Sequence, residues 1–519
     1  MKKTVALFIL ALLIVSCKPS KDYNSVVSLK GTAVFQPDWK NIAANYSCPE
    51  WFMDAKFGIF IGWGVYSVPA FGNDWYPRNM YMKDAGWAYK LTYDYHLQTY
   101  GEQTKFGYKD FIPMFKAEKF DAGEWVALFK AAGAKYVVPI AEHHDGFAMY
   151  NSDRNQWNAV KMGPKKDIVG LLKAAAEKEG LVFGLSSHRL ENAWYFNGGM
   201  RIPSDVQDTT ISLYGRRLPQ KEYWQPSEYD EAVQLDWLAH THELIDKYQP
   251  QLFWFDWTVD KIPNVFNKFM AYYYNNAVDW GKGVVVNTKQ GYPTNVQVWD
   301  VERGKSGKMM KFPWQTDTSI GKKSWGYIEG EENKTPEQIV HDLIDIVSKN
   351  GNLLLNIGPR SDGSITDEQT AVLLSIGKWL KINGEAIYGT RCWKKFGEGT
   401  SESSKGSMSD FNATTYTAAD LRFTTKGNDF YAIMLNWDEN GALIQSLNKN
   451  AIADAKILSV KMLGSDEKIA WTQTDEGLQL SCPKIKPCEF AYSFKITFDR
   501  KVGEHLTSEA VDEMTKHGG

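Results

Sequence analysis

Short apolar runs alternate with segments of helical period over most of the chain. Helices are predicted where apolar residues recur every three or four positions, at 121–133, 167–180, 231–248, 264–280, 336–349 and 367–382. Strands are predicted at the apolar runs 57–64, 135–147, 181–189, 251–257, 283–288, 296–302 and 352–358. Because these runs are apolar throughout, both faces of the sheet are expected to be buried, as in parallel sheets. This α/β pattern favours a (β/α)8-like barrel, irregular at one strand, over an open doubly wound sheet.

The pattern changes after Cys392. Ser, Thr and Gly become frequent, and short strands of alternating polarity follow, separated by turn residues, which is typical of a β-sandwich. A chain of 519 residues exceeds the roughly 250 to 300 residues at which one core stops growing, so two or three domains are expected. We predict a catalytic barrel at 39–390, a β-sandwich at 391–502 and a polar tail at 503–519.

The first residues have the form of an export signal. A basic start precedes an apolar run from Val5 to Val15 that is too short to span a bilayer as a mature helix. Ile14-Val15-Ser16-Cys17 resembles a bacterial lipobox, which predicts a signal at 1–17, lipidation of Cys17 and a tether at 18–38. The chain is then an exported lipoprotein attached to the outer membrane, periplasmic or at the cell surface. The alternative is an ordinary signal peptide followed by a chance cysteine.

Charge and cysteine content narrow the function classes. Lys and Arg total 59 against 62 Asp and Glu, and no basic stripe with interleaved aromatic residues is present, so nucleic acid is not an expected partner. Besides the lipobox cysteine, only four others are present, too few and too scattered for a disulfide framework. The sequence leaves open whether Cys482 and Cys488 pair. Apart from the lipid anchor, no membrane contact is predicted.

Polar residues recur where the predicted barrel strands end, and two carboxylates stand out among them. Asp256 lies between Phe255 and Trp257, and a carboxylate among apolar neighbours is costly unless it is paired or functional. It is either held by hydrogen bonds as a structural group or serves as a nucleophile or base. Glu302 follows two barrel units later, and two carboxylates about 5 to 5.5 Å apart would make a retaining glycosidase. Spacing alone does not exclude the other acidic candidates, Asp300, Glu191 and Asp317.

The pair His143-His144 raises the question of a metal site. Neighbouring strand residues point to opposite faces, and the other histidine pair, His240 and His242, falls in a predicted helix where positions i and i+2 diverge. Neither pair supplies the remaining ligands of a metal site, so no metal is expected. No cofactor is expected either. Recognition of sugar hydroxyls is favoured over a purely structural pair. The chain also has 20 Trp, and amphipathic rings suit the mixed faces of a sugar, so a carbohydrate chain end is the expected partner.

Taken together, several motifs resemble the α-L-fucosidases of glycoside hydrolase family 29. They are WFMDAKFGIFIGWGVYSVPA (51–70), WYPRNMY (75–81), GAKYVVPIAEHHDGFAMYNS (133–152), WNAV (157–160), FWFDW (253–257), SWGY (324–327) and NGNLLLNIGPRSDGSI (350–365). The resemblance covers about residues 40–500. It implies a (β/α)8-like barrel, a C-terminal β-sandwich, a retaining double-displacement mechanism and no metal.

The resemblance also implies roles for individual residues. Asp256 is similar to the nucleophile of the WFD motif, and Glu302 is the best candidate for the acid/base, a position that drifts within the family. The remaining residues are expected to bind or line the sugar pocket: Gly62, Trp63, Asp74, Trp75, His143, His144, His188 and Trp325.

Two positions depart from the family pattern. Family members usually have a histidine where this chain has Gly62 and a glutamate where it has Asp74. A missing imidazole removes a hydrogen bond worth about 0.5 to 1.5 kcal/mol and is expected to open space beside C6 of the sugar. The main prediction is a retaining exo-glycosidase for terminal α-L-fucosyl or α-L-galactosyl residues, 6-substituted ones included. The alternative is a carbohydrate-binding protein with weakened catalysis.

Overall fold

The computed structural model describes residues 34–217, 228–289, 291–411, 413–452 and 455–502. The predicted signal with Cys17, most of the tether and the whole polar tail at 503–519 lie outside these ranges, so the predictions made for them stay predictions. Within the described ranges, no helix has the length and apolar character that a membrane crossing requires.

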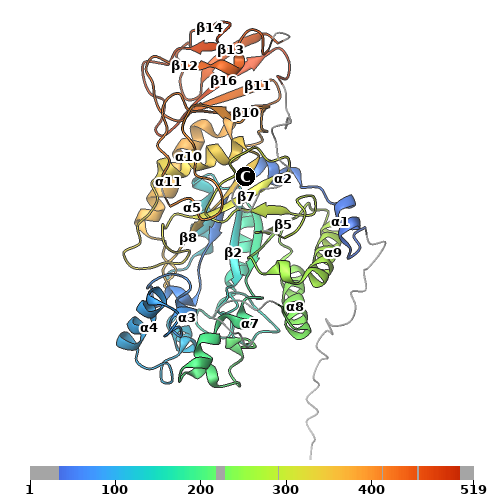
Figure 1. Cartoon of the computed structure of the whole chain (residues 1–519), viewed down its shortest axis with the longest axis vertical. Helices are drawn as coiled ribbons and strands as arrows, with labels where there is room; N and C mark the ends of the chain where they lie inside the picture. The colour runs from blue at the N-terminus through green and yellow to red at the C-terminus, as the bar shows by residue number, and fades with distance from the viewer. Residues whose placement is uncertain (1–33, 218–227, 290, 412, 453–454, 503–519) are drawn as a thin grey trace, which may run out of the picture.

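Eight parallel strands close into a barrel in chain order, with the first strand paired to the last (Figure 1). The strands are β1 (Phe57–Ile61), β2 (Tyr136–Glu142), β3 (Val182–Ser187), β4 (Leu252–Phe255), β5 (Val285–Thr288), β6 (Val298–Asp300), β7 (Trp314–Ser319) and β8 (Gly351–Ile357). The predicted (β/α)8-like barrel is confirmed. One strand was missed, because β7 reads WQTDTS and carries no apolar run.

Eleven α-helices are described, most of them surrounding the barrel. They are α1 (Trp39–Asn45), α2 (Glu50–Ala55), α3 (Tyr76–Asn79), α4 (Trp87–Thr99), α5 (Ala122–Ala131), α6 (Ile168–Glu179), α7 (Asn192–Tyr195), α8 (Glu231–Tyr248), α9 (Pro263–Trp280), α10 (Pro336–Ser348) and α11 (Asp367–Asn383). Local chemistry fixes where several helices begin. Asp121, Asp167 and Asp230 accept hydrogen bonds from backbone N–H groups in the first turns of α5, α6 and α8.

The C-terminal domain consists of two antiparallel sheets, as predicted. One sheet has the order β13-β16-β11-β10-β9 and the other β12-β15-β14. The strands are β9 (Gly397–Glu398), β10 (Leu421–Lys426), β11 (Asp429–Met434), β12 (Ala442–Ile444), β13 (Ile457–Met462), β14 (Trp471–Gln473), β15 (Leu478–Leu480) and β16 (Tyr492–Phe498). Their buried apolar side chains form a core separate from that of the barrel. Cys482 and Cys488 are both free thiols.

The domains meet beside α10 and α11, while α3, α4 and α7 gather at the opposite end of the molecule (Figure 1). Arg422 of β10 donates to Asp345 of α10 at 2.7 Å, and both side chains are buried. At the other chain end, Phe35 already packs on Tyr274 and its backbone is hydrogen-bonded to Asn275. The last residues of the expected tether therefore belong to the barrel domain.

Candidate active site

A small cavity opens where the barrel strands end, and most of the predicted site residues line it. Its walls come from strands β1, β2, β4, β7 and β8, from the segments that follow β1 to β6, and from the loop between β7 and α10. The lining residues are Phe60, Asp74, Trp75, Ile140, His143, His144, His188, Trp254, Asp256, Trp257, Lys289, Glu302, Asp317, Trp325 and Asn356. Since reactive groups of such barrels lie at this end of the strands, this cavity is the candidate active site.

Asp256 follows directly after β4 and is held as a charged group. Its Oδ2 lies 3.1 Å from His144 Nε2 and 3.3 Å from His188 Nδ1, and its Oδ1 accepts the Trp257 backbone N–H at 2.9 Å. Burial acts to raise the pKa of Asp256, but these histidine contacts and the Lys289 charge outweigh it and hold the pKa well below its usual value. The carboxylate is therefore ionised and oriented.

The acidic residues after β6 and on β7 meet around one lysine. Lys289, which follows β5, places its Nζ 3.3 Å from Glu302, 3.1 Å from Asp317 and 3.9 Å from Asp300. The ammonium group also lies over the Trp254 ring, 4.7 Å from its centroid. One cation faces three carboxyl groups, so they cannot all ionise without repulsion.

The pKa of Glu302 is consequently raised. Burial is the largest cause, the Lys289 charge opposes it, and the negative charges of Asp317 and Asp256 add to the rise. The charge of Asp256 thus reaches Glu302 across the cavity. One carboxyl group favours the ionised form and the other the protonated form, which is the division that acid/base catalysis beside a nucleophile requires.

The other acidic candidates lie differently. Asp300 is buried and accepts a hydrogen bond from Gln315 at 2.6 Å, and it does not line the cavity. Glu191 is buried and bonded to the Thr258 hydroxyl, where burial and then the Asp256 charge raise its pKa to about 8. Asp317 does line the cavity, and burial and the charge of Asp300 raise its pKa well above the usual value.

Three histidines converge on the cavity from two strands. His143 and His144 follow β2 after the strand has ended, so both rings can face the cavity, and the ring centroids lie 4.4 Å apart. His188 follows β3, and its ring stands edge-on to His144 at 4.7 Å. Trp75 packs edge-on against His144, with ring centroids 5.2 Å apart. Burial lowers the pKa of His143 and His144, the latter to about 4, so both imidazoles are neutral near pH 7.

Comparisons with known proteins agree with this arrangement. The α-L-fucosidase family model matches residues 24–385, and the model of the α-L-fucosidase C-terminal domain matches 414–497. The chain belongs to the α-L-fucosidase family, glycoside hydrolase family 29. It is 32% identical to tissue α-L-fucosidase of Mus musculus over 478 residues, which cover 89% of this chain and 94% of that one.

Further relatives extend the likeness from sequence to structure. Plasma α-L-fucosidase of Homo sapiens is 31% identical over 490 residues, covering 89% of this chain and 92% of the relative. The crystal structure of the Thermotoga maritima α-fucosidase superimposes with a TM-score of 0.70 at 31% identity, over 89% of this chain and all of that chain. The fold and the glycoside hydrolase class of this family member are thus established.

The space beside Gly62, where the resemblance led us to expect a vacancy, is filled. A Cβ atom at Gly62 would collide with the carbonyl oxygen of Trp325 and would lie 2.7 Å from Asn356 Oδ1. Asn356 Nδ2 holds that carbonyl in place with a hydrogen bond of 2.7 Å. The prediction of open space at Gly62 was therefore wrong, because a backbone segment from the β7–α10 loop fills it. Gly62 is needed for this close approach of two backbones.

Asp74, the second residue predicted to depart from the family pattern, supports the same loop. Its Oδ1 accepts the Trp325 backbone N–H at 3.1 Å, and its Oδ2 lies 3.8 Å from His143 Nε2. The peptide group before Trp325 is thus held by Asp74, and the carbonyl of Trp325 by Asn356. Gly62 and Asp74 therefore both lie against the same loop.

Trp63 was predicted to line the sugar pocket, but it lies in the core. Its ring packs between Phe115, Phe120 and Trp125 with centroid distances of 4.9 to 5.3 Å, and its indole N–H donates to Arg360 O. Alternation along the chain explains the error, since Gly62 faces the barrel interior and the next residue points to the helix layer.

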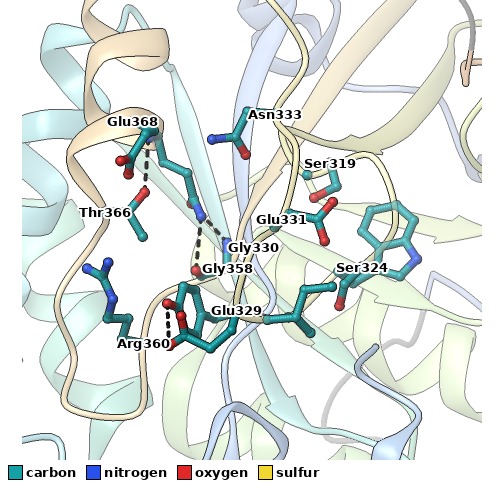
Figure 2. A pocket seen from close by; sticks show the side chains of 16 residues that line it. Ser319, Ser324, Glu329, Gly330, Glu331, Asn333, Gly358, Arg360, Thr366 and Glu368 are labelled. Carbon is teal, nitrogen blue, oxygen red and sulfur yellow. Dashed lines mark hydrogen bonds between the residues drawn. The ribbon is translucent and has the colours of Figure 1, made fainter. Parts of the chain in front are cut away.

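A second, more polar pocket of about 270 Å³ adjoins the β7–α10 loop, and Trp325 lines both cavities. Figure 2 shows Ser319, Glu331 and Asn333 on one side of it and Thr366 and Glu368, at the start of α11, on the other. The loop thus forms part of the wall of each cavity.

Two polar residues that line the cavity, Lys289 and Asn356, are absent from the site predicted from sequence. Lys289 directly follows the apolar run GVVVNT (283–288), so a charge after a buried strand was an available signal. Asn356 lies within the run NLLLNIG and gave no signal. In the sequence, a polar residue that points into the barrel cannot be told apart from one that merely interrupts an apolar strand.

Proposed function

We propose that this family member is an active retaining exo-α-L-fucosidase. The observation that carries the proposal is the opposite electrostatic setting of two carboxyl groups in one cavity. Two histidines hold Asp256 ionised, while burial and neighbouring carboxylates favour protonated Glu302. A relative from Thermotoga maritima has been crystallised with fucose and with a mechanism-based inhibitor, which supports the same class of substrate here.

In the first half of the reaction, an Asp256 oxygen attacks the anomeric carbon of the terminal sugar. The bond from this carbon to the glycosidic oxygen breaks, and Glu302 gives its proton to that oxygen as the aglycone leaves. His144 and His188 donate hydrogen bonds to the nucleophile before it reacts. These bonds keep the carboxylate oriented without neutralising it.

In the second half, water replaces the aglycone. Glu302, now ionised, takes a proton from the water molecule, whose oxygen attacks the anomeric carbon of the glycosyl ester. The bond to Asp256 breaks, the nucleophile is restored as a carboxylate, and Glu302 is protonated again. Two inversions at one carbon give net retention.

Fucosyl is the proposed glycosyl group, in preference to L-galactosyl. The expectation of an α-L-galactoside depended on space at Gly62, and the Trp325 carbonyl and Asn356 occupy that space. His143, His144 and Trp75 are the proposed contacts of the sugar ring and its hydroxyls.

Replacement of the nucleophile tests the proposal. Asp256→Gly should reduce release of the aglycone from an aryl α-L-fucoside by at least about 10³-fold. Added azide should restore turnover and give a fucosyl azide of inverted configuration, because azide takes the place of the carboxylate. With the wild type, proton NMR should show the α-anomer as the first sugar formed. Undiminished turnover in the variant would exclude the proposal.

The alternative is a carbohydrate-binding protein on the same fold. It predicts affinity for fucosylated glycans with no product after long incubation, whereas the enzyme should give product that depends on Asp256. A parallel assay with an aryl α-L-galactoside measures whether the enzyme prefers fucosyl or galactosyl substrates. We expect a lower kcat/KM for this substrate than for the fucoside.

We also propose that the protein is exported and lipidated at Cys17. The support is the lipobox-like sequence Ile14-Val15-Ser16-Cys17 after a short apolar run. Cells that express the chain should incorporate labelled palmitate into it, and Cys17→Ala should abolish the label and release the protein from the membrane fraction. Label that persists in the variant would contradict the proposal.

A further inference from the structure

Three buried atoms at the centre of the cavity lie almost equally far from one another. His144 Nε2 and Asp256 Oδ2 are 3.1 Å apart, His188 Nδ1 and His144 Nε2 are 3.2 Å apart, and His188 Nδ1 and Asp256 Oδ2 are 3.3 Å apart. They belong to segments that follow three different strands, β2, β3 and β4. The three contacts cannot all be good hydrogen bonds at once. If both imidazole nitrogens donate a proton to the Asp256 oxygen, the two N–H groups also face each other and repel.

The same triangle matches one face of a zinc coordination sphere. Zn²⁺ binds imidazole nitrogen and carboxylate oxygen at about 2.0 to 2.2 Å in tetrahedral geometry, which separates neighbouring ligand atoms by about 3.3 Å. An ion slightly above the plane of the three atoms would contact all of them at bonding distance. Two imidazoles and one carboxylate, with an open fourth position, form a common donor set for this metal.

The surroundings of the triangle add two features of a metal site. His188 Nε2 lies 3.3 Å from Ser186 Oγ. In the tautomer that binds a metal, the proton moves from Nδ1 to Nε2 and is donated to this hydroxyl, so the Nδ1 lone pair faces the triangle. The ring of His143 supplies a third imidazole, because one ligand nitrogen from each of the three histidines lies within 4.8 Å of the others.

Sequence spacing had argued against a metal because it offered no further ligand beside the adjacent pair His143-His144. The barrel provides that ligand by placing His188, at the end of β3, next to the pair. The donors are imidazoles with one carboxylate, a set that suits Zn²⁺ and not Mg²⁺, which prefers oxygen ligands in octahedral geometry.

We infer that the cavity is also a reversible binding site for Zn²⁺, with His144, His188 and Asp256 as ligands, and that the ion excludes the sugar. The exclusion follows because Asp256 Oδ2, once bound to the metal, cannot reach an anomeric carbon. Zinc is thus an inhibitor of the site and takes no part in turnover. The inhibition rests on the proposed function, whereas the metal binding does not.

Direct titration tests the binding without any need for activity. The full chain is titrated calorimetrically with ZnCl₂ and spectroscopically with CoCl₂, whose tetrahedral complexes absorb strongly in the visible range. We expect one ion per chain, displacement of cobalt by zinc, and no response to MgCl₂. L-Fucose at saturating concentration should weaken the apparent zinc affinity, and zinc should raise KM for an aryl fucoside while kcat stays constant.

Variants assign the ligands. His188→Gln removes one donor and should weaken zinc affinity at least about 10-fold and change the cobalt spectrum. His242→Gln is the matched control, since this buried histidine of α8 stacks on Tyr272 outside the cavity, and its zinc affinity should equal that of the wild type.

Equal affinities in wild type and His188→Gln, or the absence of stoichiometric binding, would overturn the metal site. Binding that fucose does not weaken would overturn the exclusion, and an inactive enzyme with intact zinc binding would count against the proposed function alone.

Discussion

At the scale of single residues, the site depends on opposite shifts of the pKa of two carboxyl groups whose intrinsic pKa values are similar. Asp256 receives hydrogen bonds from His144, His188 and the Trp257 backbone, all aimed at its charged form. Glu302 shares Lys289 with Asp317 and therefore receives only part of one positive charge. The difference between nucleophile and acid thus comes from the neighbours of each group.

Replacement of the proposed acid should have an effect that depends on the leaving group. Glu302→Gln is expected to lower kcat on a fucosylated oligosaccharide by about 10²- to 10⁴-fold, because the aglycone then leaves unprotonated. An aryl fucoside with an acidic phenol needs little protonation, so its first step should be nearly unaffected, with a burst of phenol in stopped-flow measurements. Glu191→Gln is the control. If that variant shows the leaving-group dependence instead, the assignment to Glu302 is wrong.

Lys289 should set the pH range of the enzyme. Its charge acts to lower the pKa of Glu302 and that of Asp256. Without that charge both pKa values rise, so Lys289→Met should shift both limbs of the kcat/KM profile to higher pH, by about one pH unit. Lys322→Met, which removes a partly exposed partner of Glu332, should leave the profile in place. A shift towards acid would contradict the argument.

At the scale of elements, the barrel strands differ in how clearly the sequence shows them. Seven strands carry apolar runs, and the predicted positions overlap those in the structure. The eighth, β7, consists of Trp, Gln, Thr, Asp, Thr and Ser, all buried. Its polar side chains have partners on other segments. Asp317 accepts a hydrogen bond from Lys289, and the Thr316 hydroxyl donates to the carbonyl oxygen of Gly304. A strand of this kind is recognisable only once its partners are in place.

The β7–α10 loop explains why Gly62 cannot carry a side chain. Gly62→Ala should lower the free energy of unfolding by about 1 to 3 kcal/mol, because the new methyl group overpacks against the Trp325 carbonyl. Gly62→His should cost more and should reduce fucosidase activity, since the loop with Trp325 must move. Guanidinium unfolding measures both variants.

Gly123→Ala is a matched control for these substitutions. Gly123 lies near the start of α5, where an added methyl group would meet only the side chain of Asp121, at 3.2 Å. This variant should retain wild-type stability. A Gly62→His protein that is as stable as the wild type and more active on fucosides would contradict the account of the loop.

At the scale of the whole molecule, buried charges join the barrel to the β-domain. Asp345 of α10 accepts hydrogen bonds from Arg422 of β10 at 2.7 Å and from Lys349 at 2.8 Å. Its pKa is well below the usual value because these cations more than offset the effect of burial. The carboxylate is thus stable only while the β-domain supplies the arginine.

Loss of the arginine should therefore destabilise the protein. Arg422→Met leaves the buried Asp345 with one cation fewer and should lower the free energy of unfolding by about 3 kcal/mol. Arg391→Met removes a partly exposed ion pair with Asp54 near the same boundary and should cost less than about 1 kcal/mol. Thermal unfolding followed by circular dichroism compares them. Equal effects of the two variants would show that the buried pair does not tie the domains together.

The sequence by itself determined the barrel, the β-domain, the family and the strand-end residues Asp256, His143 and His144. These features follow from local pattern. Buried strands must be apolar, and side chains at the strand ends must be polar if they are to bind a sugar or react with it. Only the tertiary structure decided that Lys289 shares its charge among three carboxyl groups, that Trp63 lies in the core, and that the Trp325 carbonyl fills the space beside Gly62. Each of these is a contact between segments far apart in the chain. The number of residues between two segments does not determine how far apart they lie in the folded protein.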